Sequence, residues 1–294
     1  MSDGIFTVIY GPSKTGKSTA TGAAGASGLF IAQTGGLLPL KNFLGLEKVR
    51  AKAAKNVQEA GDIVTKAAGK VPTIVVDDFS LLAEITVMEL EKVHAFGEMW
   101  RNLRQQVLFM RDAARFATSK GTHVFFNCHQ APPKTSSGKY VRGGPQLPGQ
   151  LPEQFSAFAD VVARVEYEET ASPWKYVLRT GPNPEYISGD RLGVLPETAP
   201  MNLREALSAA GYELPRPEGL EWMGPIVEKT SALILKEGIE DWRGTLSKVA
   251  EKLRGQHDLR HVRWVLQDSL HRAVITNAGE NILDRMFIDE QENW

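Results

Sequence analysis

The sequence predicts an α/β protein, with a mostly parallel β-sheet covered by helices and a small helical domain after it. Short runs of β-branched and aromatic residues alternate with longer helical runs through the first two-thirds of the chain. Such alternation is typical of a parallel sheet with helices on both faces. From about Pro196 this pattern ends, and a segment with several Pro and Gly residues leads into a wholly helical end.

Six segments have the composition of β-strands. We expect these strands at Ile5–Tyr10, Leu29–Gln33, Thr73–Asp77, His123–Cys128, Val161–Tyr167 and Lys175–Thr180. Little more than a turn separates the last two, so they are predicted to form an antiparallel hairpin at an edge of the sheet. Two segments between the strands, Glu47–Ala68 and Leu81–Ser119, have helical composition and spacing.

The predicted domain boundaries follow the change of pattern. We expect an α/β core over residues 1–200, a linker over 201–217 and a helical C-terminal domain over 218–294. Apolar residues recur at helical offsets in two stretches of that last domain. Asp258 precedes the second stretch and is expected to cap its helix.

Composition narrows the class of protein. An apolar content of 42% and a charged content of 23% in 294 residues are those of an ordinary globular protein. The net charge of −1 means that any contact with nucleic acid must come from local patches. The one cysteine, Cys128, excludes an internal disulfide and fits a reducing compartment. No signal peptide or membrane span is visible, so we expect a soluble cytoplasmic protein, in the host cell if it is viral.

The strongest motif lies between the first strand and a helix-like segment. Residues 11–18 satisfy the P-loop pattern G-x-x-x-x-G-K-[ST] at every fixed position. Gly11 and Gly16 are expected to let the chain curl so that backbone N–H groups point at phosphate oxygens. Lys17 can then reach the β- and γ-phosphates, and the Ser18 hydroxyl can hold Mg²⁺. The residues predicted to bind ATP are Gly11, Pro12, Ser13, Lys14, Thr15, Gly16, Lys17, Ser18 and Thr19.

Two other strands end in polar residues. Asp77 ends a buried strand and is predicted to hold the water shell of Mg²⁺ opposite Ser18. Asp78 faces the other way in a regular strand, toward the attacking water or a neighbouring loop. His129 and Gln130 follow another strand and can face the γ-phosphate as a sensor. A hydrogen bond from His129 to a neighbouring loop is an equal alternative.

Residues 131–152 form a segment with many Pro and Gly residues. It carries three cations, Lys134, Lys139 and Arg142, and no acidic residue. This composition predicts a mobile loop without regular structure. Its charge suits contact with single-stranded DNA, with Tyr140 as a stacking platform. The alternative is a disordered surface loop.

In the order of these motifs the sequence resembles the phage-type RecA-like ATPases, a family associated with single-strand annealing and recombination. The later motifs that carry the resemblance are LPGQLPEQFSAFADVV, YVLRTG and SGDRLG, within residues 5–200. The resemblance implies a RecA-like core, ATP with Mg²⁺, homo-oligomeric rings or filaments, and single-stranded DNA bound by the 131–152 loop. It also implies that Lys17 and Ser18 bind nucleotide and metal, Asp77 the metal shell, and His129 acts as sensor. Arg179 and Arg191 match the region that often offers a cation to a neighbour's ATP, and the predicted catalytic residues are Lys17, Asp77, Asp78 and His129.

The sequence departs from this family at one point. The strand after the P-loop helix usually ends near a glutamate that positions the hydrolytic water. Here Gln33 or Thr34 stands in that place, and neither side chain can act as a base. Hydrolysis would then depend on Asp78 or another acidic residue, or be slow.

Three functions remain open at this point. The first is an ATPase that acts on single-stranded DNA in phage recombination, annealing or replication. The second is an assembly or scaffold protein that uses ATP as a switch with little hydrolysis. The third is a small-molecule or nucleotide kinase, which usually has an arginine-rich lid; the 131–152 loop has one arginine.

Overall fold

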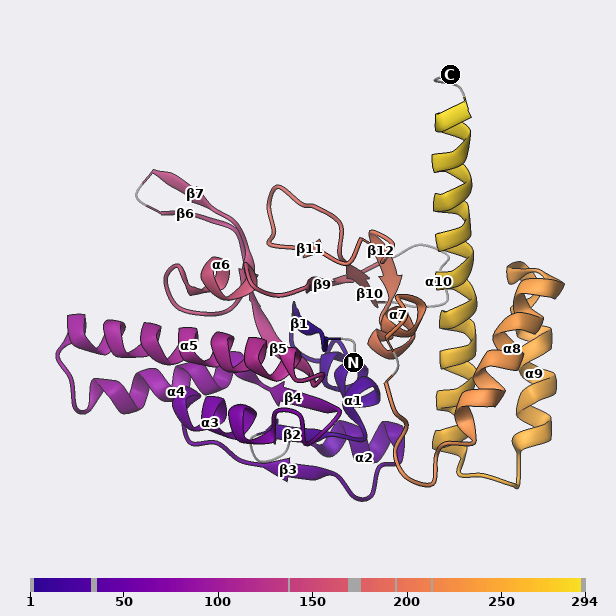
Figure 1. Ribbon diagram of the computed structural model, residues 1–294, viewed down its shortest axis with the longest axis horizontal. Coiled ribbons are helices and arrows are strands. Elements are labelled where there is room, and N and C mark those ends of the chain that lie inside the picture. The colour runs from indigo at the N-terminus through magenta and orange to yellow at the C-terminus, as the bar shows by residue number, and fades with distance from the viewer. Residues whose placement is uncertain are drawn as a thin grey trace.

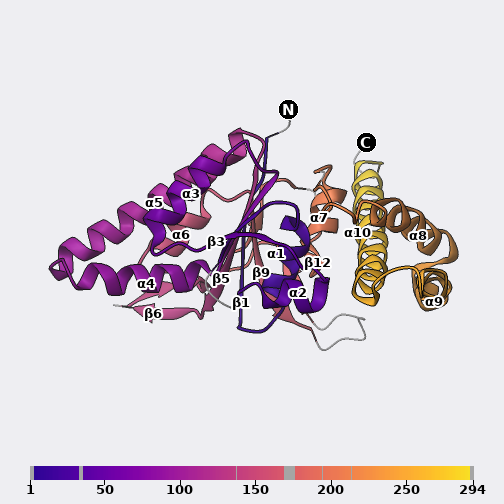
Figure 2. The ribbon, with the colours of Figure 1, turned by 90° about the horizontal axis from the view of Figure 1, so that it is seen from below.

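The computed structural model describes residues 3–32, 36–136, 138–168, 176–193, 195–212 and 214–291. Its centre is one large β-sheet with helices on both faces (Figures 1 and 2). Along the sheet the strands are β12 (Thr198–Pro200), β10 (Tyr176–Arg179), β9 (Val161–Tyr167), β1 (Phe6–Gly11), β5 (His123–Ala131), β4 (Thr73–Asp77), β2 (Leu29–Ala32) and β3 (Arg50–Lys52). The six strands from β9 to β3 run parallel, which confirms the predicted fold class.

The strand order places β5 between the strand that leads to the P-loop and the strand that ends in Asp77. Strand β1 lies between β9 and β5, and β5 lies between β1 and β4. In the β1–β5 pair Gly11 is in register with His129. Because parallel strands end at the same edge of a sheet, the segments after β1, β4 and β5 meet at one edge.

Helices cover the two faces of the sheet in separate groups. Figure 2 shows α3 (Val57–Ala67), α4 (Phe79–Glu91) and α5 (Phe96–Ser119) on one side, with α1 (Lys17–Gly25), α2 (Leu38–Leu44) and α7 (Leu203–Ala209) on the other. Strands β1 and β4 are buried along their whole length, as expected for strands that helices cover on both faces. Phe6, Phe79, Phe126 and Phe155 form an aromatic cluster under the first group, with ring centroids 4.8–5.4 Å apart.

Three predicted elements are different in the structure. The segment expected to be a helix from Glu47 contains the edge strand β3, and α3 begins only after Asn56, whose side chain accepts the N–H of Glu59 at 2.9 Å. The helical segment up to Ser119 is two helices, α4 and α5, with a turn between them. The β9–β10 pair is antiparallel as predicted, but β12 pairs outside β10 and forms the edge. Local composition did not reveal these breaks because they depend on pairing and capping.

The prediction of an irregular loop over residues 131–152 is wrong. Its described residues contain a two-stranded hairpin, β6 (Lys134–Ser136) and β7 (Lys139–Val141), the short strand β8 (Gly144–Pro145) and the start of helix α6 (Leu151–Ser156). Strand β5 continues to Ala131 and pairs there with β8. The fully buried Phe155 ties α6 to the aromatic cluster. Tertiary pairing and burial therefore overcome a composition that favours turns.

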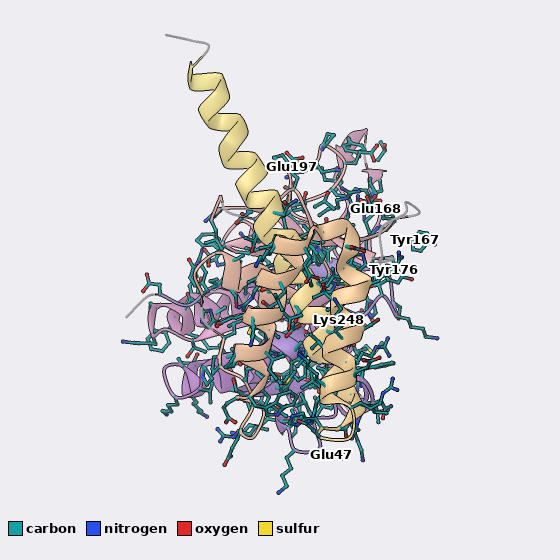
Figure 3. All side chains as sticks on the ribbon, turned by 90° about the vertical axis from the view of Figure 1, so that its right-hand side faces the viewer. Glu47, Tyr167, Glu168, Tyr176, Glu197 and Lys248 are labelled. Atoms are coloured by element: carbon teal, nitrogen blue, oxygen red, sulfur yellow. The ribbon has the colours of Figure 1, made fainter. Side chains whose placement is uncertain are left out.

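The C-terminal region is helical, as predicted. Its helices are α8 (Met223–Glu237), α9 (Trp242–Leu253) and α10 (Leu259–Gln291). The Oδ1 atom of Asp258 accepts the N–H of Arg260 at 2.8 Å, which confirms the predicted cap of α10. These helices lie beside α1, α2 and α7, in front of the core in Figure 3. Within the described ranges no helix is long and apolar enough to cross a membrane.

One apolar cluster extends from the sheet into these helices. It includes Ile9 and Val75 of the sheet together with Leu253 of α9 and Trp264 and Val265 of α10. The predicted domain boundaries at 200 and 217 therefore stay a prediction, since residues on both sides of them share this cluster.

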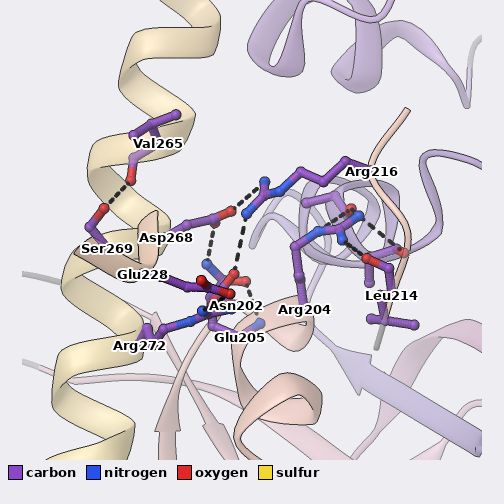
Figure 4. Close-up of polar contacts among 12 residues, drawn as sticks. Asn202, Arg204, Glu205, Leu214, Arg216, Glu228, Val265, Asp268, Ser269 and Arg272 are labelled. Atoms are coloured by element: carbon purple, nitrogen blue, oxygen red, sulfur yellow. Dashed lines mark hydrogen bonds and ion pairs between the residues drawn. The ribbon is translucent and has the colours of Figure 1, made fainter. Parts of the chain in front are cut away.

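A buried ionic cluster joins α7, the segment after it and α10 (Figure 4). Arg216 lies 2.8 Å from Asp268, and Arg272 lies 2.5 Å from Glu205, measured between nitrogen and oxygen. The Asn202 amide donates to Asp268 at 2.7 Å. Glu205 and Asp268 are 0% and 1% exposed. Buried charges are retained when they are paired. Each charged group of this cluster has an ion-pair partner, and Asp268 and Glu205 also accept hydrogen bonds from Asn202 and Arg272.

Burial changes the acid–base properties of this cluster. Burial raises the pKa of Glu205 to about 7; the charge of Asp268 adds to the rise and Arg272 opposes it. The neighbouring Arg204 is 2% exposed, and burial lowers its pKa to about 10. Its guanidinium donates to the carbonyl of Ala23 at 3.0 Å, in α1. The cluster therefore connects α10 through α7 to the helix that follows the P-loop.

Asp268→Asn removes the charge of Asp268 with little change of shape and leaves the buried Arg216 guanidinium with one carboxylate partner, Glu205 at 3.5 Å. We expect the free energy of unfolding, measured in urea, to fall by about 1–3 kcal/mol, since one buried ion pair is lost while Glu205 still compensates Arg216. Glu47→Gln is the matched control, because Glu47 pairs with Lys41 and Arg260 at the surface, where water screens the charges, and its loss should have little effect. If the free energy of unfolding fell equally in the two variants, burial of the ion pair would not explain its contribution to stability.

Candidate nucleotide-binding site

The P-loop connects the end of β1 to the start of α1. Gly16 has φ +89°, a left-handed conformation that glycine adopts readily. A Cβ atom at this position would meet no atom closer than the Met201 Cε, 3.8 Å away. The backbone conformation, not lack of space, therefore requires glycine here. The N-terminus of α1 begins directly after Gly16, so its free N–H groups face the loop.

Gly11 has a different role from the one expected. It ends β1, and a Cβ atom there would lie 2.7 Å from the Cβ of Val165 on β9. Val165 is buried and has no room to move. Gly11 therefore permits close approach of β9, whereas the curl of the loop depends on Gly16.

Lys17 points back into the loop. Its Nζ atom donates to the carbonyl oxygens of Gly11 at 3.0 Å and Pro12 at 2.6 Å. The residue is 8% exposed, and burial lowers the pKa of its amine while the charges of Asp78 and Asp77 oppose this shift. A buried ammonium that bonds to carbonyl oxygens is suited to an anion in the loop, because charge-assisted hydrogen bonds are the stronger ones.

Asp77 and Ser18 place two oxygen atoms that can bind a metal ion beside Lys17. Asp77 is 8% exposed, and burial raises the pKa of its carboxyl, while hydrogen bonds from Ser18 and Asn127 oppose this shift. The Asn127 amide also donates to Thr21 at 2.8 Å, which fixes this side chain under α1. A carboxylate and a hydroxyl are hard oxygen ligands, and Mg²⁺ is commonly held by one or two carboxylates together with substrate phosphates. The residues present therefore fit Mg²⁺.

Asp78 faces α4 and the end of β5. Its Oδ1 atom accepts the N–H groups of Ser80 at 2.8 Å and Leu81 at 3.3 Å, so it caps α4. Its Oδ2 atom lies 2.6 Å from the Nε2 atom of His129. The sequence predicts that His129 either senses the γ-phosphate or bonds to a neighbouring loop. Both alternatives stay open, because its imidazole contacts the Asp78 carboxylate and also borders the cavity described next.

A cavity of about 1120 Å³ begins at the P-loop and extends to the C-terminal helices. Asp77, Asp78 and His129 border it beside residues 13–19 of the loop. The wall of the cavity that α9 and α10 supply could not be predicted from the sequence. It includes Trp242, Leu246, Arg263, Trp264, Gln267 and His271. Some of these residues belong to the predicted apolar stripes, but nothing in their spacing shows that the stripes pack beside the P-loop.

The other predicted site residues do not line this cavity. On the β6–β7 hairpin Lys134 and Tyr140 are exposed, and Arg142 just after it lies 3.4 Å from Glu153. Lys139 lies in β7 of the same hairpin. Gln33 and Thr34, where the sequence lacks the expected glutamate, lie outside the described residues.

Arg179 and Arg191, the two candidates for a cation offered to a neighbouring subunit, both make contacts within this chain. Arg179 pairs with Glu166 at 2.7 Å and Glu168 at 3.3 Å and donates to Thr198. Arg191 donates to the carbonyl of Ala157 and borders a separate cavity of about 570 Å³. Arg179 ends β10 and Arg191 follows β11 (Gly189–Asp190), which pairs with β9, so both lie toward the β9–β12 side of the sheet. Within its own subunit neither arginine borders the cavity at the P-loop.

Comparison with known proteins identifies the family. Residues 3–192 match the family described as AAA domain, and the chain belongs to this family of P-loop ATPases. No curated protein matches the chain. Similar solved structures include the RadB recombinase, at 12% identity over 61% of this chain and 89% of that one, with a TM-score of 0.39. The flagellar accessory protein FlaH from Methanocaldococcus jannaschii is 14% identical over 63% of this chain and 89% of that one, with a TM-score of 0.38.

The cap at Asp78 can be tested by stability. Asp78→Ala removes the oxygen that accepts the first N–H groups of α4 and should lower the free energy of unfolding by about 1 kcal/mol. Asp78→Asn keeps a capping oxygen and should be nearly as stable as the wild type in the same urea titration. An Asn variant as unstable as the Ala variant would show that the ion pair with His129, not the cap, stabilises this turn.

Proposed function

We propose that the protein is a phage-type RecA-like ATPase that binds ATP with Mg²⁺ in the cytoplasm and acts on single-stranded DNA in recombination, annealing or replication. The observation that carries this proposal is the meeting of the P-loop with the buried Asp77 at one edge of the sheet. A P-loop and a strand-end aspartate together are the parts that position a nucleoside triphosphate and its metal ion.

The residues of the loop have distinct roles in this proposal. The backbone N–H groups of residues 13–19 bind phosphate oxygens, and Lys17 exchanges its bonds to the loop carbonyls for bonds to the phosphates. Ser18 and Asp77 hold Mg²⁺, which supplies positive charge against the phosphates when it is bound. Asp78 holds the imidazole of His129 at the cavity, where His129 contacts the γ-phosphate or the attacking water.

One observation favours the second candidate, an ATP-switched assembly protein with little hydrolysis. The Asp78 carboxylate already accepts two N–H groups and contacts His129, so it is poorly placed to act as a free base. A general base typically contributes ~10²–10⁴-fold in rate. We therefore expect slow basal hydrolysis.

ATP turnover measured with and without single-stranded DNA separates the candidates. Stimulation by DNA supports the proposed function, and binding without turnover in either condition supports the switch. Transfer of phosphate to a small acceptor would instead identify a kinase.

Lys17→Ala should abolish ATP binding, because it removes the ammonium that offsets the phosphate charge. Isothermal titration with MgATP measures the affinity, and circular dichroism checks that the variant is folded. Lys66→Ala is the matched control, since Lys66 is exposed on α3 at the other face of the sheet. Unchanged ATP affinity in a folded Lys17→Ala protein would show that residues 11–18 are not the site that binds the phosphates of ATP.

The β6–β7 hairpin is the proposed contact with single-stranded DNA. It projects from the end of β5, away from the C-terminal helices (Figure 1). The described cations there, Lys134 and Arg142, lie at exposed positions, and Tyr140 is 56% exposed. Exposed cations beside an exposed ring suit a flexible phosphate backbone with unstacked bases.

Replacing Lys134, Lys139 and Arg142 together by Ala should weaken the binding of single-stranded DNA and its dependence on salt. At ~0.7 per phosphate contact, the slope of log K against log salt should fall by about two units. Fluorescence anisotropy over a series of salt concentrations measures both. A triple variant of the exposed lysines Lys229, Lys236 and Lys248 on α8 and α9 has the same loss of charge and should keep the wild-type slope. Equal slopes in the wild type, the hairpin variant and the control variant would show that the hairpin does not contact DNA.

We also propose that the protein forms a homo-oligomeric ring or filament in which Arg179 or Arg191 approaches the ATP of a neighbouring subunit. Arg179→Ala or Arg191→Ala should then lower turnover more than ATP affinity. Mixing Lys17→Ala subunits with arginine-variant subunits should restore activity, because some interfaces pair an intact nucleotide site with an intact arginine. Mixtures no more active than the separate variants, or a protein that stays monomeric with ATP and DNA, would contradict this arrangement.

A further inference from the structure

The cavity at the P-loop has two chemically different ends. The loop end presents backbone N–H groups, Lys17 and the carboxylates, which suit a phosphate chain. The far end carries apolar and aromatic side chains, Phe43 and Leu44 from α2, Trp242 and Leu246 from α9, and Leu270 from α10, beside the polar Arg263, Gln267 and His271 of α10. The total of about 1120 Å³ exceeds the ~300–1,000 Å³ of pockets that enclose a drug-sized ligand. A phosphate chain alone would leave the apolar end empty.

Phe43 presents an exposed aromatic ring to this cavity. Its side chain is 58% exposed, like that of Leu38 at 59%, whereas Leu40 and Leu44 of the same helix are buried in the core; of the two exposed side chains, Phe43 is the one that lines the cavity. An exposed ring at the wall of a pocket can stack against an aromatic ligand that enters the pocket. Trp242, at the start of α9, supplies a second, partly buried ring to the same cavity.

The wall opposite the P-loop is fixed to the core. The Arg260 side chain of α10 donates to the carbonyl of Lys41 in α2 at 3.0 Å. A Cβ atom on Gly45, just after α2, would lie 2.8 Å from the Nε2 atom of His261, so α10 packs closely against α2. The buried ion pair of Asp268 with Arg216 holds the next turns of α10. The far end is therefore a preformed surface of this same chain.

We propose that this apolar end is the subsite for the nucleobase, with Phe43 and Trp242 as the rings that contact it. The proposal rests on the proposed function, since it takes the P-loop as the site of the phosphate chain. It gives the C-terminal helices a role in the recognition of the nucleotide: they complete the base subsite within one subunit. The ligand class is an aromatic base joined through its sugar to a triphosphate.

The first test compares MgATP with magnesium tripolyphosphate, which has the same phosphate chain but no base or sugar. Phe43→Ala is expected to weaken the binding of ATP by about 10-fold, the effect of removing one stacking ring, and to leave the tripolyphosphate affinity unchanged. Isothermal titration of the full-length protein measures both. Phe96→Ala is the matched control, because Phe96 is 76% exposed on α5 outside the cavity and should change neither affinity.

The second test reads the α9 side of the subsite by tryptophan fluorescence. ATP should change the emission of the wild-type protein and tripolyphosphate should not. The change specific to ATP should shrink in Trp242→Phe, a substitution that keeps an aromatic ring in place and so preserves the packing of α9.

The outcomes separate the two proposals. Wild-type protein that binds neither ligand would overturn the proposed function and the subsite together. Protein that binds both ligands, but whose ATP affinity is unchanged in Phe43→Ala or falls together with the tripolyphosphate affinity, would overturn the subsite alone. Equal fluorescence changes with the two ligands would also overturn it.

Discussion

Parallel pairing of β1, β5 and β4 is the constraint on which the rest of the structure depends. Because the three strands run in one direction, the P-loop, Asp77 and His129 emerge at the same edge of the sheet. Each of these segments is separated from the others by a long stretch of chain, and the backbone hydrogen bonds of the sheet bring them together. Strands buried on both faces hold this edge rigidly.

Burial of charge at that edge determines its chemistry. Lys17 and Asp77 are both nearly excluded from water, and burial moves their pKa values in opposite directions, toward the neutral forms. Each is compensated by neighbours: loop carbonyls for the ammonium, a hydroxyl and an amide for the carboxylate. Such groups are poised to accept a highly charged ligand with its metal ion, because each then gains an opposite charge in direct contact.

The C-terminal helices are part of the same construction. The cluster of Arg216, Asp268, Glu205 and Arg272 joins α10 to α7, and Arg204 joins α7 to the P-loop helix α1. Charges this deeply buried need defined geometry, so they favour one position of α10 beside the cavity. A region that the sequence marks only as helical thus becomes a wall of the candidate nucleotide-binding site.

The sequence by itself determined the P-loop, the strand that ends in Asp77, the parallel α/β class and the helical C-terminus. These follow from local patterns: fixed spacing in a turn, runs of β-branched residues, and apolar residues at helical offsets. Only the tertiary structure decided that the described part of residues 131–152 contains the strands β6, β7 and β8, that Asp78 caps α4 and contacts His129, and that Phe43 and Trp242 border the same cavity. The physical reason is that pairing, capping and packing depend on contacts between residues distant in sequence, and no local pattern encodes those contacts.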